Sequence, residues 1–190
     1  MKTIRLAILV AAAAFTFSGA VAAAGAHANL CEREMLRAAA KHGVPLGMLY
    51  AVGLTETGRG DSLRPYALNI EGRATYDDDK ATAMRRFETA RTSGAKLIDV
   101  GCMQINHHFH GTHFGSIGEM FEPAANVDYA ARFLKELRAR EGSWTMAVAR
   151  YHAGPSNNPA QKRYVCRVIA NMVATGFGAW TGQSIEFCRR

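Results

Sequence analysis

The feature that most constrains the fold is an apolar run over residues 45–57 that carries one carboxylate, Glu56, near its end. The run is long enough for a helix, it opens with a proline suited to a first turn, and Gly58 follows it as a stop. At helical spacing, Glu56 shares a face with Leu49 and Val52. The sequence therefore predicts an apolar helix whose C-terminal end holds an acid.

Two effects are expected to raise the pKa of Glu56 in this position: the loss of water and the negative end of the helix dipole. A carboxyl group that stays protonated near neutral pH can act as a general acid. The alternative is a helix-end glutamate that rotates into solvent and has no chemical role. The apolar run alone does not separate these two interpretations.

Residues 1–28 have the pattern of a secretory signal peptide. Residues 1–5 are basic, residues 6–17 are almost continuously apolar, and residues 26–28 follow the small-x-small pattern of a cleavage site. The apolar segment is too short to span a bilayer comfortably, so we expect it to be removed and not to form a stable membrane anchor. The pattern predicts an exported, periplasmic protein.

The chain after residue 28 is basic. Removing residues 1–28 takes two of the 23 basic residues, Lys2 and Arg5, and none of the 16 acidic ones, which leaves 21 against 16 and a formal charge of +5. This charge suits an anionic partner such as a cell-wall polymer, or it serves only for solubility. No basic stripe with interleaved aromatic residues is present, so no nucleic-acid partner is expected. We expect residues 29–190 to form one domain that acts as a monomer.

All four cysteines follow residue 28, and an even number in an oxidising compartment predicts two disulfides. Sequence alone does not choose among the three connectivities. We favour Cys102–Cys166 with Cys31–Cys188, because the second bond would join the two ends of the chain. The cysteines have no Cys-x-x-Cys spacing, so we do not expect them to bind a metal.

The remaining pattern predicts an α+β, mostly α, single domain with a small β-hairpin inserted after the second helix. Periodicity, capping residues and glycine stops predict further helices at residues 29–42, 77–93, 123–140, 144–152 and 159–173. Residues 66–76 are predicted to form a hairpin that turns at Glu71 and Gly72, and residues 96–100 a short strand. The histidine-rich residues 107–113 are expected to form a loop.

Three short motifs stand in order along the chain. They are Leu54-Thr55-Glu56-Thr57-Gly58, Gly101-Cys102-Met103-Gln104-Ile105-Asn106 and Ala149-Arg150-Tyr151-His152-Ala153-Gly154. Their order and spacing resemble the catalytic domain of soluble lytic transglycosylases, which are goose-type-lysozyme-like enzymes of the glycoside hydrolase family 23 type. That family shows Glu-Ser-Gly, Gly-x-Met-Gln-Ile and Tyr-Asn-Ala-Gly. The resemblance covers residues 31–175.

The resemblance implies a lysozyme-like fold and cleavage of the β-1,4 bond from N-acetylmuramic acid (MurNAc) to N-acetylglucosamine (GlcNAc) in peptidoglycan glycan strands, without a cofactor or metal. Glu56 matches the family's catalytic acid, which protonates the departing oxygen and then, as the carboxylate, takes a proton from the muramoyl C6 hydroxyl. The product is a 1,6-anhydro sugar, and one carboxylate suffices because no water is consumed. Tyr151 matches the tyrosine that hydrogen-bonds to the acid, although its helical position would also suit a core residue.

The same resemblance assigns sugar contacts. Met103 and Gln104 match residues that line the cleft, where methionine gives an adaptable apolar wall and glutamine gives directional hydrogen bonds; Met103 would equally suit the core. Thr57 replaces the usual serine and keeps a hydroxyl group. His152 replaces the usual asparagine and could add a pH-sensitive contact near Glu56.

Three further residues are candidates for substrate binding. Asn106 binds sugar or caps a turn, and the sequence does not separate the two roles. Tyr66 and Asn69 belong to the predicted hairpin, which could form the other lip of the cleft. Aromatic and amide side chains suit sugar rings, and the hypothesis for these two residues rests on position only.

Asp99 is the candidate for a second carboxylate. If it faced Glu56 across the cleft, it could activate water for inverting hydrolysis; the alternative is that Asp99 orders the end of its strand. The histidines between His107 and His113 suggest a metal site. They lack a clear carboxylate or cysteine partner, so we expect a solvated or cleft-edge loop.

These observations together predict an exported peptidoglycan lytic transglycosylase. Two alternatives stay open: a hydrolytic muramidase on the same scaffold, and a non-catalytic peptidoglycan-binding assembly factor. By analogy with specialised members of the family, the protein could open the wall locally for a secretion, conjugation or flagellar complex.

Overall fold

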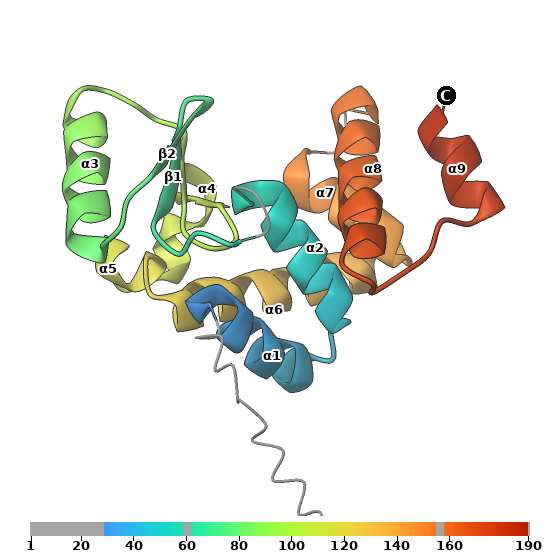
Figure 1. Cartoon of the computed structure of the whole chain (residues 1–190). Coiled ribbons are helices and arrows are strands. Elements are labelled where there is room, and N and C mark those ends of the chain that lie inside the picture. Colours follow the sequence, from blue (N-terminus) through green and yellow to red (C-terminus); the bar gives the residue numbers. More distant parts are fainter. Residues whose placement is uncertain (1–28, 59–61, 155–157, 190) are drawn as a thin grey trace, which may run out of the picture.

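Figure 1 shows a computed structural model of the chain, which describes residues 29–58, 62–154 and 158–189. The helices are α1 (Leu30–His42), α2 (Leu46–Thr57), α3 (Lys80–Thr92), α4 (His107–His110), η1 (Gly111–His113, 3-10), α5 (Ile117–Met120), α6 (Pro123–Glu141), α7 (Trp144–His152), α8 (Asn158–Ala174) and α9 (Gly182–Arg189). The strands are β1 (Ala67–Ile70), β2 (Arg73–Tyr76), β3 (Ile98–Val100) and β4 (Ile105–Asn106). The predicted α+β, mostly α, lysozyme-like fold class is confirmed.

Helix α2 is the predicted apolar helix, and it packs against α1 and α8. Gly53 allows a close approach, because a Cβ atom there would lie 2.5 Å from Cε of Met35 and 3.1 Å from Cδ2 of Leu63. Contacts this short leave no room for a larger residue. The last turn of α2, which carries Glu56, ends between the sheet and helix α7 (Figure 1).

The strands form one antiparallel sheet in the order β2-β1-β3-β4. The predicted hairpin is confirmed, and its turn residues Glu71 and Gly72 have φ angles of 49° and 89°. Two positive φ angles characterise the type I′ turn, whose twist matches that of paired antiparallel strands. Asn69, Asp99 and Asn106 occupy neighbouring positions on β1, β3 and β4. A row of three polar residues therefore crosses the sheet.

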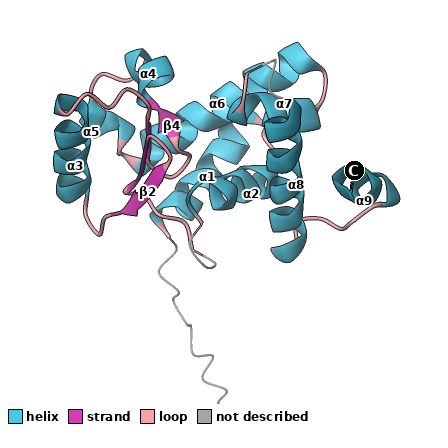
Figure 2. Cartoon of the chain, turned by 90° about the horizontal axis from the view of Figure 1, so that it is seen from above, coloured by secondary structure: helices cyan, strands magenta, loops and turns pink. Residues whose placement is uncertain are grey.

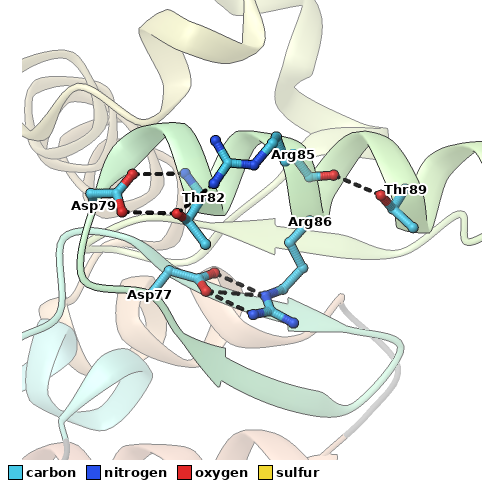
Figure 3. A network of polar contacts seen from close by, with 6 residues as sticks. All are labelled: Asp77, Asp79, Thr82, Arg85, Arg86 and Thr89. Carbon is cyan, nitrogen blue, oxygen red and sulfur yellow. Dashed lines mark hydrogen bonds and ion pairs between the residues drawn. The ribbon is translucent and has the colours of Figure 1, made fainter.

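Helix α3 lies beside the hairpin and is tied to the end of β2 (Figures 1 and 3). Asp79 caps the helix by accepting hydrogen bonds from the backbone N–H and the hydroxyl of Thr82, both at 2.8 Å. Arg86 donates to both carboxylate oxygens of Asp77 at 2.8 to 3.2 Å (Figure 3). The predicted start of this helix at the aspartates is confirmed.

A buried asparagine on α6 holds the loop between β3 and β4. The Nδ2 group of Asn126 donates to the carbonyl oxygens of Val100 and Met120 at 2.9 and 3.0 Å, and its Oδ1 accepts from the N–H of Met103 at 2.9 Å. Gly101 has a φ of 79°, and a Cβ atom there would lie 2.7 Å from Asn126 Nδ2. These contacts fix the backbone of the second motif.

The disulfides join Cys31 to Cys102 and Cys166 to Cys188. The favoured pairing of Cys102 with Cys166 and of Cys31 with Cys188 is therefore wrong. The reason is spatial: Cys31, in the first turn of α1, lies beside the loop that carries Cys102. The C-terminal helix α9 instead contacts α8 and lies far from α1 (Figures 1 and 2).

Two segments differ from the prediction. The histidine-rich segment forms α4 and η1 instead of a loop, because Asn106 caps α4 by accepting hydrogen bonds from the N–H groups of His108 and Phe109. The C-terminal tail contains the unpredicted helix α9. The proposed signal peptide, residues 1–28, lies outside the described residues. Among the residues that the structure describes, no helix has the length and apolar character of a membrane span.

Candidate active site

A cavity of about 550 Å³ lies where the sheet meets the end of α2 and helix α7. All three sequence motifs contribute to its lining, through Glu56, Gln104–Asn106 and Arg150–Gly154. The opposite wall comes from the hairpin, with Asn69 and the turn residues. The structure thus brings together residues that are nearly 100 positions apart in the chain.

Glu56 is partly exposed as a residue, while its carboxyl group is enclosed by protein. Burial raises the pKa of Glu56 from 4.5 to about 7. A hydrogen bond from Tyr164 and the charge of Arg167 oppose this rise, and the charge of Asp99 adds to it. About half of the Glu56 carboxyl groups are therefore protonated at neutral pH, which suits a general acid.

The phenol that contacts the acid is Tyr164, on α8. Its hydroxyl donates to Oε1 of Glu56 at 2.6 Å, and the Tyr164 side chain is buried. The hydroxyl of Tyr151 instead donates to the carbonyl oxygen of Met103 at 2.8 Å. The expected hydrogen bond from Tyr151 to the acid is therefore corrected: Tyr151 lines the cavity and holds the second motif. Tyr164 lies outside all three motifs, so sequence reasoning missed it.

His152 connects the third motif to this pair. Its ring stacks on that of Tyr164, with the centroids 4.2 Å apart and the planes 3° from parallel. Burial lowers the pKa of His152, and the charges of Arg167 and Arg163 lower it further. A neutral imidazole is therefore favoured beside Glu56 at neutral pH.

The polar row of the sheet faces the same cavity. Asn106 donates to the Asp99 carboxylate at 2.6 Å while its Oδ1 caps α4, so it serves as a cap and also lines the cavity. Oδ1 of Asn69 and Nη1 of Arg150 are buried and have no hydrogen-bond partner within the described residues. Both residues line the cavity, so its wall holds two buried polar atoms that the protein itself leaves unpaired.

Gln104 lines the cavity from a strained backbone position with a φ of 44°. Its Nε2 donates to the carbonyl oxygens of Ala67 and Gly101 at 3.2 and 3.1 Å. Both amide protons are therefore used within the protein, which leaves the Gln104 side-chain oxygen to accept a hydrogen bond from a ligand.

Three of the residues predicted to bind substrate are not among the residues that line the cavity. Thr57 is buried, and its hydroxyl lies 3.2 Å from the carbonyl oxygens of Gly53 and Cys102. Met103 is fully buried in the core. Tyr66 is partly buried and packs against the same core. The burial of Thr57 and Met103 gives these two side chains supporting roles. Tyr66 is only partly buried, so its contact with a sugar stays a prediction.

The histidine-rich segment forms an aromatic cluster at the cavity edge. His110 lines the cavity, and its Nδ1 lies 2.7 Å from the hydroxyl of Tyr129. His113 packs against the same tyrosine, with the ring centroids 5.2 Å apart. Within the described ranges, no three residues among histidine, cysteine, aspartate and glutamate gather in a group that could hold a metal ion.

The roles of the two tyrosines can be separated by their phenylalanine variants. Tyr164→Phe removes a hydrogen bond that lowers the pKa of Glu56, so that pKa is expected to rise further. For a general acid at this position, which would act in its protonated form, the alkaline limb of the pH–rate profile should move to higher pH. The rate below pH 7 should fall about 10-fold because the carboxylate loses its partner.

Tyr151→Phe is the matched control, because its hydroxyl contacts a backbone carbonyl oxygen and not the acid. Its alkaline limb should stay in place. The comparison is made by measuring, for both variants from pH 5 to 9, the rate at which they solubilise peptidoglycan, the substrate that the resemblance implies. A limb that moved in Tyr151→Phe and not in Tyr164→Phe would show that the hydrogen bonds are assigned to the wrong residues.

Comparison with known families agrees with this geometry. The sequence profile of the family described as "Transglycosylase SLT domain" matches residues 35–169, which include all three motifs and Tyr164. The comparisons with curated proteins and with solved structures found no match. Because the match covers more than half of the chain, the protein belongs to the transglycosylase SLT domain family, whose members are peptidoglycan lytic transglycosylases.

Proposed function

We propose that the protein cleaves the MurNAc-β-1,4-GlcNAc bond of peptidoglycan without water and leaves 1,6-anhydro-MurNAc ends. The observation that carries this proposal is the enclosed Glu56 carboxyl group, whose pKa of about 7 gives both the acid and the base form near neutral pH. A single group can then supply the proton in one step and remove one in the next.

In the first step, protonated Glu56 donates its proton to the glycosidic oxygen as the bond to the muramoyl C1 breaks. The Tyr164 hydroxyl then stabilises the resulting carboxylate through its 2.6 Å hydrogen bond. In the second step, the carboxylate takes the proton of the muramoyl C6 hydroxyl, whose oxygen bonds to C1. The proton returns to Glu56, and the atoms balance without a second substrate.

A hydrolytic muramidase is the second candidate, because Asp99 lines the same cavity. The charge of Asp99 raises the pKa of Glu56, so the two carboxyl groups lie within electrostatic reach. Burial raises the pKa of Asp99, and the hydrogen bond from Asn106 opposes that rise. An ionised Asp99 could activate a water molecule or stabilise positive charge on the sugar.

Mass spectrometry of the muropeptides released from purified sacculi distinguishes the two reactions. We expect the wild type to release products with anhydro ends. The Asp99→Asn variant should release the same products, at a rate within about 10-fold of the wild type. If the wild type instead released products with reducing ends, and Asp99→Asn did not, the reaction would be hydrolysis and Asp99 would be its second carboxylate.

We also propose that residues 1–28 direct export to the periplasm and that the protein acts there as a monomer. The basic charge of residues 29–190 and the two disulfides support an oxidising compartment that contains an anionic polymer. A partner complex for secretion, conjugation or flagellar assembly fits local opening of the wall. Fractionation of cells that express the full chain tests the location, because the protein should be recovered in the periplasmic fraction.

A further inference from the structure

We propose that a second, cationic cavity between α8 and α9 binds the carboxylates of the peptide stems that peptidoglycan carries on its muramoyl residues. The cavity measures about 780 Å³. None of its nine lining residues is acidic, and four are cationic: Lys162, Arg163, Arg167 and Arg189. The inference rests on the proposed function, since it concerns how the same substrate is held.

The cationic cavity adjoins the active site through one residue. His152 lines both cavities, and its stack on Tyr164 places the boundary beside the phenol that contacts Glu56. Arg167 belongs to the cationic cavity, and its charge acts on both Glu56 and His152. A substrate bound at Glu56 therefore has a positively charged pocket directly beside it.

The cations are held in place by the structure around them. The Cys166–Cys188 disulfide forms part of the lining and joins α9 to α8. Lys162 lies over the ring of Phe187 at 5.7 Å, and Arg167 lies over the ring of Tyr164 at 5.8 Å. These contacts leave the charged groups available to a ligand, because aromatic rings do not neutralise them.

Of the fifteen other lysines and arginines that the structure describes, nine form ion pairs with acids. Lys41 pairs with Asp128, Arg86 with Asp77 and Arg150 with Glu141. Within the described ranges, none of the four cations of this cavity forms an ion pair with a carboxylate. Arg163 and Arg167 are moreover four residues apart on one helix, where like charges repel. An anionic ligand would relieve that repulsion.

Peptide stems supply this charge at the required place. Each stem is attached to the lactyl group of a muramoyl residue, the sugar whose C1 reacts, and it ends in free carboxylates. Arginine binds carboxylates through paired N–H groups, and a partly enclosed pocket strengthens the contact. The location beside the glycan cavity favours stems over an unrelated anion, which would have no reason to be held next to Glu56.

Matched glycan substrates test this inference. The wild type is compared on strands that retain their stems and on strands from which an amidase has removed them. We expect kcat/KM to be about 10-fold higher on the strands with stems. In the double variant Lys162→Glu/Arg189→Glu, kcat/KM on these strands should fall about 10-fold, mainly through KM, while kcat/KM on bare strands stays unchanged.

A control variant and a binding measurement complete the design. Arg64→Glu/Lys135→Glu makes the same change of net charge at exposed positions outside both cavity linings, and it should behave like the wild type. Calorimetry with a soluble tetrapeptide stem should show binding to the wild type. The signal should be lost with the amidated peptide and with Lys162→Glu/Arg189→Glu.

The outcomes separate this inference from the proposed function. Absence of cleavage on both substrates would contradict the proposed function, while calorimetry would still report on the peptide site. Cleavage that does not depend on stems, together with equal peptide binding by wild type and variant, would overturn the stem-binding site and leave the reaction standing. If kcat/KM on strands with stems fell equally in the control variant, the effect would come from general attraction between charges and not from a binding site for stems.

Discussion

Replacing Glu56 with glutamine is expected to lower the rate of muropeptide release by about 10³-fold, the largest effect of any single substitution in this protein. Glutamine keeps the size of the side chain and can still accept the hydrogen bond from Tyr164, but it can neither donate the proton nor remove one. Quantifying released muropeptides by mass spectrometry over several hours checks the result. If Glu56→Gln digested sacculi at the wild-type rate, the catalytic role of Glu56 would be contradicted, and a non-catalytic, peptidoglycan-binding role would be left for the protein.

The same variant carries its own control for folding. The folded protein holds the Glu56 proton up to about pH 7, whereas the unfolded chain releases it near pH 4.5. The folded state therefore loses stability as pH rises through this window, because the enclosed carboxyl group must ionise. Glu56→Gln should consequently be about 2 kcal/mol more stable than the wild type at pH 8 and about equally stable at pH 4.5. The value at pH 8 is smaller than the full pKa shift would give, because the cavity opens to water and water screens the charge. A variant that unfolded more easily at pH 8 would point to misfolding as the cause of its inactivity.

Removing the Cys31–Cys102 disulfide is expected to lower the free energy of unfolding by about 4 kcal/mol, because the bond closes a loop with a sequence separation of 71 residues. Both cysteines are fully buried, and the bond joins α1 to the loop that carries the second motif. Thermal unfolding of Cys31→Ala/Cys102→Ala should show a melting temperature about 10 °C lower, together with reduced activity.

The second disulfide provides the comparison. Cys166–Cys188 has a sequence separation of 22 residues and joins α9 to α8. In Cys166→Ala/Cys188→Ala, α9 is expected to detach from α8 while the rest of the domain stays folded. Its melting temperature should therefore fall less than that of Cys31→Ala/Cys102→Ala. Equal losses in both variants would show that α9 belongs to the cooperative core.

Local signals in the sequence predicted much of the fold. Asn29, Asp79 and Ser143 each cap a predicted helix by accepting a hydrogen bond from a backbone N–H of its first turn. The hairpin turns at Glu71 and Gly72 because these residues adopt positive φ angles. Such features depend on a few neighbouring residues, so a single sequence suffices to find them.

Contacts between distant residues could not be found in this way. Tyr164 meets Glu56 across 108 positions, and a tyrosine on the buried face of a helix resembles any core residue. Asn126 likewise gave no signal on α6, although it fixes the loop of the second motif. The prediction of the cysteine pairing failed for the same reason, because the pairing depends on which distant segments meet in the fold.

The motifs predicted residues that the structure brings together at one cavity, but they did not separate contact from support. Glu56, Gln104 and Tyr151 line the cavity, as expected from their motifs. Thr57 and Met103 belong to the same motifs and are buried behind it. A motif records which residues the site requires, and the sequence alone does not say which of them face the substrate.

The most direct test of a protonated acid in an enclosed cavity is an NMR titration of the Glu56 carboxyl carbon in the wild type, with Glu56→Gln used to assign its signal. The titration midpoint should lie at about pH 7, because burial outweighs the hydrogen bond from Tyr164. A midpoint near the ordinary glutamate value of 4.5 would mean that the carboxyl group is hydrated and ionised at neutral pH, and it would contradict the role of Glu56 as general acid.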